Sequence, residues 1–259
     1  MTVFAKVKKI LPQENYMFFG DTKNMPYGEK TEEQLIEIAK NIFDFFEEQQ
    51  VKAVVMACNT TSAVTYEKLK NNYDFKIYPI IQSVAGFLAK LPVKRLGVFA
   101  TPATIKSGVY QREINKINQE MKIFGMDCPE WVKIVETGTE KQPQAAAIIR
   151  QNLEVMLENK PEKIVLGCTH YPFLLPVLKT IAPEDLFIDP ADYFAEYIKS
   201  DMIRENLQNT TNTAPFEKFY VSADPENFKK SGAMFYQLEN EPKLVLPDNT
   251  FVCQNIALN

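Results

Sequence analysis

Two stretches of this 259-residue chain share one pattern and decide its fold: VVMACNTT at residues 54–61 and IVLGCTHY at residues 164–171. In each, an apolar run of strand length ends in a small residue and a cysteine. Small hydroxyl or amide residues follow, and then a segment with helical periodicity. Cys58 and Cys168 stand 110 residues apart at matching strand-to-helix junctions, so the two thiols could face each other across one substrate.

The rest of the chain alternates short apolar runs with helical segments, which predicts an α/β fold with mainly parallel sheets flanked by helices. A helix is predicted at residues 3–11, a second from a capping box at Thr31 and Gln34, and a third at residues 145–157. Strands are predicted at residues 16–19, 53–57, 77–81, 96–100, 164–167, 219–222 and 244–246.

The two cysteine stretches form a weak internal repeat, in which His170 aligns with Thr60. The repeat predicts two pseudo-symmetric lobes with the site between them: residues 1–84 plus 192–259, and residues 85–191. In the second lobe the opening strand ends near Ala100, 68 residues before Cys168. The same distance before Cys58 lies upstream of the first residue. We therefore expect the first lobe to lack its opening strand, and the chain to begin inside the first helix.

Composition argues against several classes of protein. Apolar residues make up 46% of the chain, which is ample for a packed core. The formal net charge is −4, and no basic run or basic-aromatic stripe appears, so we expect no nucleic-acid partner. No stretch approaches the length of a membrane span, and the start lacks the features of a signal peptide. A cytoplasmic protein without a membrane partner is therefore expected.

The four cysteines, Cys58, Cys128, Cys168 and Cys253, form no C-x-x-C pair, and the chain has one histidine. These counts predict neither a metal site nor a disulfide. Cys128 and Cys253 match no catalytic pattern and are interpreted as structural. No phosphate-cradling G-x-x-x-x-G-K pattern occurs, so a nucleotide-dependent mechanism is not expected.

Several short motifs together resemble the glutamate racemases of the aspartate/glutamate racemase superfamily. They are FGDT and MPYG within residues 19–28, ACNT at 57–60, TPAT at 101–104, ETG at 136–138 and GCTHYP at 167–172, in the order of that family. The resemblance implies interconversion of L- and D-glutamate without a cofactor, supplying D-glutamate for peptidoglycan. The family also opens with a strand that carries Asp-Ser-Gly. This motif is absent here, in agreement with the argument from the repeat.

Racemisation removes a proton from one face of a carbon and returns one to the opposite face, so it needs two groups with matched roles. One thiol acts as thiolate base while the other gives a proton. An unperturbed thiol pKa of about 8.5 leaves a small thiolate fraction at neutral pH. Cys58 and Cys168 precede predicted helix starts, whose field should favour the anion. The resemblance implies that Cys58 attacks D-glutamate and Cys168 attacks L-glutamate. The alternative is two inert, buried cysteines.

His170, two residues after Cys168, could polarise that thiol or help to protonate the substrate's carbanion. The resemblance implies supporting acid-base groups in Asp21 and Glu136. A structural histidine and solvated or capping carboxylates are the plainer alternatives. We expect the substrate to be bound by Pro26, Tyr27, Gly28, Asn59, Thr60, Thr101, Thr104 and Thr169. The alternative for these residues is ordinary capping and turn formation.

Two other functions stay open: a related racemase or isomerase with another substrate, such as aspartate, and a truncated, impaired or binding-only member of the family. A missing central strand would remove several buried side chains, each contributing about 1.5–3 kcal/mol. A domain's whole stability is about 5–15 kcal/mol, so the chain as written is expected to be poorly soluble or weakly active. The sequence does not decide the oligomeric state, and a homodimer is left open.

Overall fold

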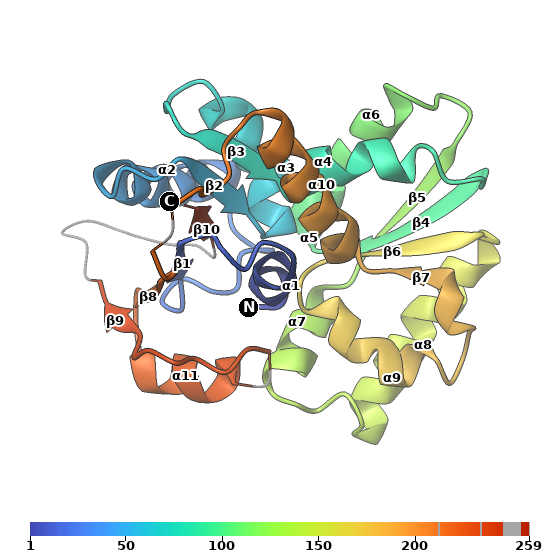
Figure 1. Cartoon of the computed structure of the whole chain (residues 1–259). Coiled ribbons are helices and arrows are strands. Elements are labelled where there is room, and N and C mark those ends of the chain that lie inside the picture. The colour runs from blue at the N-terminus through green and yellow to red at the C-terminus, as the bar shows by residue number, and fades with distance from the viewer. Residues whose placement is uncertain (212, 234, 246–254, 259) are drawn as a thin grey trace.

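The computed structural model describes residues 1–211, 213–233, 235–245 and 255–258. Within this part of the chain, the strands form two separate sheets that lie side by side, each flanked by helices (Figure 1). Most strand pairs are parallel. The predicted α/β class is confirmed.

The first sheet collects strands from both ends of the described chain. β1 pairs in parallel with β8, and β2 pairs in parallel with β3. β10 lies between β1 and β2 and runs antiparallel to both, which the sequence did not predict. The strand order is β3 (Lys76–Pro79), β2 (Ala53–Met56), β10 (Asn255–Leu258), β1 (Tyr16–Gly20), β8 (Glu217–Val221) and β9 (Lys243–Leu244).

The second sheet is built from the middle of the chain, and all of its described strand pairs are parallel. The carboxyl ends of its strands therefore meet at one edge. The strand order is β5 (Lys122–Asp127), β4 (Arg95–Ala100), β6 (Lys163–Gly167) and β7 (Phe187–Ile188).

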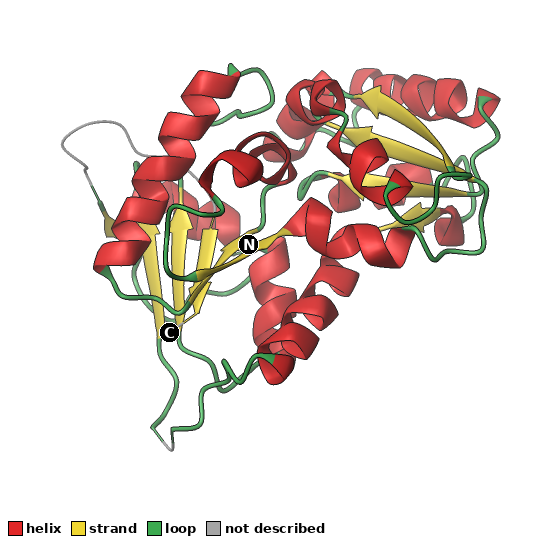
Figure 2. Ribbon diagram, turned by 90° about the horizontal axis from the view of Figure 1, so that it is seen from above, coloured by secondary structure: helices red, strands yellow, loops and turns green. Residues whose placement is uncertain are grey.

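Helices cover the sheets and fill the space between them (Figure 2). α1 and α10 pack against each other, and α10 also packs on α4. The helices are α1 (Thr2–Ile10), α2 (Glu32–Glu48), α3 (Asn59–Leu69), α4 (Ile80–Leu88), α5 (Pro102–Ser107), α6 (Val109–Asn115), α7 (Pro129–Glu136), α8 (Pro143–Glu158), α9 (Leu175–Leu178), α10 (Pro190–Arg204) and α11 (Pro225–Gly232). Two 3-10 helices are η1 (Tyr171–Leu174) and η2 (Glu184–Leu186).

The amphipathic face of α1 shows how the predicted periodicity becomes packing. Val3, Phe4 and Val7 are all buried. The Phe4 ring meets the rings of Phe18 and Phe219 edge-on, with centroids 5.8 and 5.5 Å apart. Such pairs add about 0.5–1.5 kcal/mol beyond the burial of their area. The first helix is thereby fixed against the sheet that carries β1.

The capping box is confirmed, because the Thr31 hydroxyl accepts from the Gln34 backbone N–H while the Gln34 side chain accepts from the Thr31 N–H. The predicted strand at 77–81 is too long, because β3 ends at Pro79 and α4 begins at Ile80. Part of the predicted strand at 244–246, and Cys253, lie outside the described residues. Within the described chain, no helix is both long and apolar enough to cross a membrane.

Candidate active site

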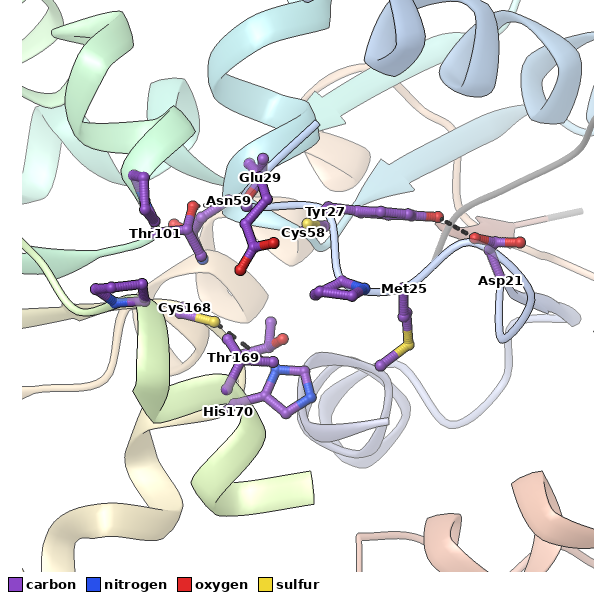
Figure 3. Close-up of a pocket in the computed structure, with 16 residues that line it drawn as sticks. Asp21, Met25, Tyr27, Glu29, Cys58, Asn59, Thr101, Cys168, Thr169 and His170 are labelled. Atoms are coloured by element: carbon purple, nitrogen blue, oxygen red, sulfur yellow. Dashed lines mark hydrogen bonds between the residues drawn. The ribbon is translucent and has the colours of Figure 1, made fainter. Parts of the chain in front are cut away.

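A cavity of about 690 Å³ lies where strands of both sheets end. β1 leads to Asp21, β2 to Cys58, β4 to Thr101 and β6 to Cys168, and all four residues line the cavity. Figure 3 shows Cys58 and Cys168 on different sides of the open space. The predicted meeting of the two half-sites is therefore present in the geometry.

Cys58 is the N-cap residue of α3. Burial raises the pKa of its thiol, and the nearby charge of Cys168 acts in the same direction. Hydrogen bonds from the backbone N–H groups of Thr61 and Thr60 lower the pKa, but they do not offset the burial. The predicted helix start is present at Cys58, and its backbone N–H groups favour the thiolate as expected, but desolvation outweighs them and the net pKa is raised.

Cys168 does not stand at the start of a regular α-helix. The chain turns through Thr169 and His170 into the 3-10 helix η1, and α9 after it has only four residues. Pro172 and Pro176 lie in the first turns of these two elements, where a helix has no use for the missing N–H group. The prediction of a helix start after Cys168 is therefore wrong. The polar group beside the Cys168 thiol is the His170 ring.

His170 bridges Cys168 and Glu136. Its Nδ1 lies 3.7 Å from the Cys168 Sγ, and its Nε2 lies 2.5 Å from the Glu136 Oε1. Burial lowers the pKa of His170, but the hydrogen bonds and charges of Cys168 and Glu136 outweigh it and raise the pKa to about 9. The hydrogen bond from His170 lowers the pKa of Glu136. Glu136 does not line the cavity itself but lies behind His170.

The Asp21 carboxylate lies at one end of the cavity and is held by donors from two segments (Figure 3). It accepts hydrogen bonds from the Tyr27 hydroxyl at 2.7 Å and the Ser222 hydroxyl at 2.5 Å. The backbone N–H and side-chain amide of Asn24 donate as well. Burial raises the pKa of Asp21, while these hydrogen bonds oppose the change. In this arrangement the carboxylate orders the loop that carries Tyr27.

Three buried hydroxyls connect the two half-sites. Thr60 follows Cys58, and its Oγ1 lies 2.8 Å from the Thr101 Oγ1, which in turn lies 2.9 Å from the Thr104 Oγ1. The Gly28 carbonyl accepts from the Ala103 backbone N–H at 3.2 Å. A Cβ on Gly28 would lie only 2.8 Å from the Thr101 Cβ. The loop from the first sheet therefore approaches the second sheet closely at this glycine.

Most of the predicted site residues line the cavity. Thr104 and Glu136 do not line it: the Thr104 hydroxyl contacts the Thr101 hydroxyl, and the Glu136 carboxylate contacts His170. Cys128 is buried, donates its backbone N–H to Ala100 and does not line the cavity. The predicted residues that line the cavity are Asp21, Pro26, Tyr27, Gly28, Cys58, Asn59, Thr60, Thr101, Cys168, Thr169 and His170.

Sequence reasoning missed five further residues of the cavity wall. Glu29 and Pro102 directly follow predicted site residues, so adjacency was an available signal. Glu29 extends its carboxylate into the open space between the two half-sites (Figure 3). The others come from the loop of β1 or from α7, which follows β5 of the second sheet. The missed residues are Met25, Glu29, Pro102, Pro129 and Val132.

The cavity can bind an anion only through neutral donors and His170, because no Lys or Arg is among the described residues that line it. Asn59 is 2% exposed, and its side-chain Nδ2 has no hydrogen-bond partner within the described structure. No group of three or more His, Cys, Asp or Glu residues in the described ranges could hold a metal ion. Neutral donors of this kind can hydrogen-bond a small carboxylate.

Comparison with known proteins agrees with this geometry. Residues 2–198 match the family model described as Asp/Glu/Hydantoin racemase. A glutamate racemase from Thermoanaerobacter sp. (strain X514) is 36% identical over 236 residues, which cover 90% of this chain and 88% of the relative. The chain therefore belongs to the Asp/Glu/Hydantoin racemase family.

Solved structures give the same result. The glutamate racemase from Francisella tularensis in complex with D-glutamate superposes with a TM-score of 0.88 at 29% identity, covering 95% of this chain and 93% of that one. The glutamate racemase from Thermus thermophilus in complex with beta-chloro-D-alanine superposes with a TM-score of 0.82 at 28% identity, covering 95% and 92% of the two chains.

Proposed function

We propose that this chain is a glutamate racemase that interconverts L- and D-glutamate through Cys58 and Cys168, without a cofactor. The observation that carries the proposal is that the two cysteines, delivered by strands of different sheets, line one cavity from different sides. The curated relatives of similar length that bear the name glutamate racemase support the choice of substrate.

The reaction follows from two groups placed on either side of the substrate Cα. A thiolate takes the α-proton, the electron pair of the Cα–H bond stays on the substrate, and the planar carbanion is stabilised by its carboxyl group. The opposite thiol then gives its proton to the other face, so that one cysteine ends protonated and the other ionised. In this scheme Cys168 attacks L-glutamate and Cys58 attacks D-glutamate. Exclusion of water strengthens the electrostatic contribution of the surrounding dipoles.

His170 and Glu136 support the Cys168 half of this scheme. With a pKa of about 9, His170 carries a positive charge at neutral pH. An imidazolium beside a cysteine favours the reactive thiolate. Glu136 keeps the imidazole protonated and orients its ring through the contact at Nε2. Both residues thus act on the step in which Cys168 removes a proton.

On the Cys58 side, the backbone N–H groups of Thr60 and Thr61 would stabilise the thiolate while burial opposes it. Part of the required stabilisation therefore has to come with the substrate, whose ammonium group would enter the cavity beside the two thiols. With its pKa raised, the Cys58 thiol stays protonated at neutral pH and so holds a proton that can be returned to the substrate. Asp21 acts on this half through Tyr27 and the loop of Pro26 and Gly28.

The substrate carboxylates would be bound by Asn59 and by the hydroxyls of Thr60, Thr101 and Thr169. The N-terminus of α3 adds backbone N–H donors. Thr104 fixes the hydroxyl of Thr101.

The wider role follows from the same chemistry. The product D-glutamate would supply peptidoglycan synthesis. A cytoplasmic location fits a mechanism that needs two reduced thiols, and the three described cysteines are unpaired. A homodimer and the lobe boundaries at 84/85 and 191/192 belong to the proposal. Light scattering on purified protein would test the first, and limited proteolysis would test the second.

A substrate panel tests the proposed function. Purified protein is incubated with L-glutamate, L-aspartate and L-glutamine, and the enantiomers are separated by chiral chromatography. Conversion of L-glutamate towards an equal mixture is expected, with aspartate converted at least about tenfold more slowly, since one methylene is worth about 1–3 kcal/mol in a fitted site. Preference for aspartate would assign another racemase of the family, and conversion of none would leave a binding-only protein.

A further inference from the structure

Tyr110 lies behind the cavity and contacts both cysteine half-sites, although neither the sequence motifs nor the proposed chemistry assigns it a role. It belongs to α6, beside the second sheet, and is 4% exposed. Its hydroxyl lies 2.7 Å from the Oδ1 of Asn59, the residue after Cys58 in the first sheet's half of the site. This buried contact joins residues 51 positions apart.

The ring of Tyr110 also lies close to Gly167, the residue before the second cysteine. A Cβ placed on Gly167 would lie 3.2 Å from the Tyr110 Cε2 and 2.8 Å from the Phe99 carbonyl oxygen. Gly167 directly precedes Cys168. A side chain at this position would therefore be forced against the ring, and glycine allows Tyr110 to lie directly under the Cys168 segment.

The direction of the hydrogen bond decides what Asn59 offers to the cavity. Burial raises the pKa of Tyr110 well above its ordinary value, so the phenol keeps its proton and donates it to Oδ1. In the flipped amide, Nδ2 would donate to the phenol, and the phenolic proton would need another acceptor. No other acceptor contacts the Tyr110 hydroxyl in the described chain. The observed orientation is thus the better satisfied one.

With Oδ1 occupied, Nδ2 is the polar atom of Asn59 that remains for a ligand. It is buried and has no partner among the described residues, and Asn59 lines the cavity. A buried donor without an acceptor is unfavourable, so a bound carboxylate that accepts from Nδ2 would relieve this cost. We propose that Tyr110 is a positioning residue, which directs Asn59 Nδ2 at the substrate carboxylate and holds the Cys58 and Cys168 segments in register.

This inference rests on the proposed function for its kinetic test. Tyr110→Phe removes the hydroxyl and keeps the ring, and Asn59→Ala removes the amide that the hydroxyl orients. For Tyr110→Phe we expect kcat/KM for glutamate to fall about tenfold, the loss of one hydrogen bond to a charged group. The double variant should be no slower than Asn59→Ala alone, since Tyr110 acts through Asn59. The pH profile of Tyr110→Phe should match the wild type.

Tyr16→Phe is the matched control, because the Tyr16 hydroxyl also makes a buried hydrogen bond, at 2.7 Å to the Leu11 carbonyl, outside the cavity. We expect it to keep wild-type kcat/KM. A Tyr110→Phe variant with unchanged kcat/KM, or losses in the double variant that simply multiply, would overturn the inference and leave the proposed function standing.

A second double-mutant cycle, measured on stability, tests the role of Tyr110 independently of the proposed racemase activity. A wild-type protein that does not racemise glutamate refutes the proposed function and says nothing about Tyr110. The same four proteins are therefore also unfolded in urea. Tyr110→Phe and Asn59→Ala should be non-additive in the free energy of unfolding, since each breaks the same bond. Additive losses would overturn the inference whatever the activity.

Discussion

Replacing Glu136 by Gln removes the carboxylate that contacts His170 Nε2 and keeps the shape of the side chain. In the wild-type protein the pKa of His170 is about 9, against an unperturbed value of 6.5. Without the charge of Glu136, the pKa falls towards the unperturbed value. If the fall is complete, the protonated fraction at about pH 7.5 drops from about 97% to about 9%, roughly tenfold. Near pH 6 the imidazole stays mostly protonated in both proteins.

The assay is the pH dependence of kcat from L-glutamate to D-glutamate, between about pH 6 and pH 9. L- and D-glutamate have equal free energies in water, so kcat/KM must be equal in both directions. An effect of Glu136→Gln on the Cys168 half-site alone is therefore sought in kcat. We expect the ratio of Glu136→Gln to wild-type kcat to be close to unity at acid pH. It should fall up to about tenfold near pH 7.5.

Glu130→Gln is the matched control, because it changes the net charge by the same amount in the same helix, α7, where Glu130 lies in the first turn. Glu130 does not line the cavity, and His170 contacts Glu136 instead. A constant ratio across the pH range for Glu136→Gln, or an equal loss in Glu130→Gln, would refute the reasoning about His170.

The free energy of unfolding should follow the same titration. Because the pKa of His170 is raised on folding, its contribution to stability is fully present below pH 6.5 and is lost as the pH rises through about 9. The pKa of Glu136 is lowered on folding from its ordinary 4.5, so its contribution is present above that value and is lost on acidification. The difference in the free energy of unfolding between wild type and Glu136→Gln should therefore be largest between about pH 4.5 and pH 6.5. It should become smaller as the pH rises towards about 9. A gap that widens as the pH rises would contradict the assignment.

Three further substitutions test one contact at the site and two features of the fold. Gly28→Ala places a Cβ 2.8 Å from the Thr101 Cβ and should raise KM about tenfold or more by moving the loop; a wild-type KM would show that the loop adapts. Gly97→Ala meets the flexible Met156 Sδ at 2.9 Å and should destabilise the fold by about 1–3 kcal/mol in urea unfolding with little change in KM. Thr31→Ala removes a confirmed cap and should cost about 1 kcal/mol in the same assay, and an unchanged midpoint would count against it.

Local patterns predicted much of the fold. The apolar runs before Cys58 and Cys168 became β2 and β6, and the capping box began α2 where Thr31 predicted. Such features depend on a few neighbouring residues, so one sequence is enough to find them. The strand predicted at 77–81 ends at Pro79 instead, because α4 begins at Ile80 and Ile81 donates its N–H to the Ser62 hydroxyl. That acceptor comes from another helix and was not visible in the local pattern.

The site was predicted from motifs, but its electrostatics were not. Whether burial or the helix field prevails at Cys58 depends on how the other sheet closes the cavity. Ser222 is another residue that sequence reasoning missed. It lies 201 positions from Asp21 and yet donates to its carboxylate. Tyr110 likewise reaches Asn59 only through packing of α6. The antiparallel insertion of β10 between β1 and β2 is equally non-local.

In the proposed mechanism two thiols, one following a strand of each sheet, exchange the α-proton of glutamate. The most direct measurement is to incubate wild type, Cys58→Ser, Cys168→Ser and Cys128→Ala with L-glutamate in deuterium oxide, and to follow the α-proton by NMR and the enantiomers by chiral chromatography. We expect D-glutamate deuterated at Cα from wild type and Cys128→Ala. Racemisation should be slowed by at least about 10²-fold in each serine variant, since a hydroxyl is a far weaker acid than a thiol. Near-normal racemisation by either serine variant would contradict the proposed mechanism.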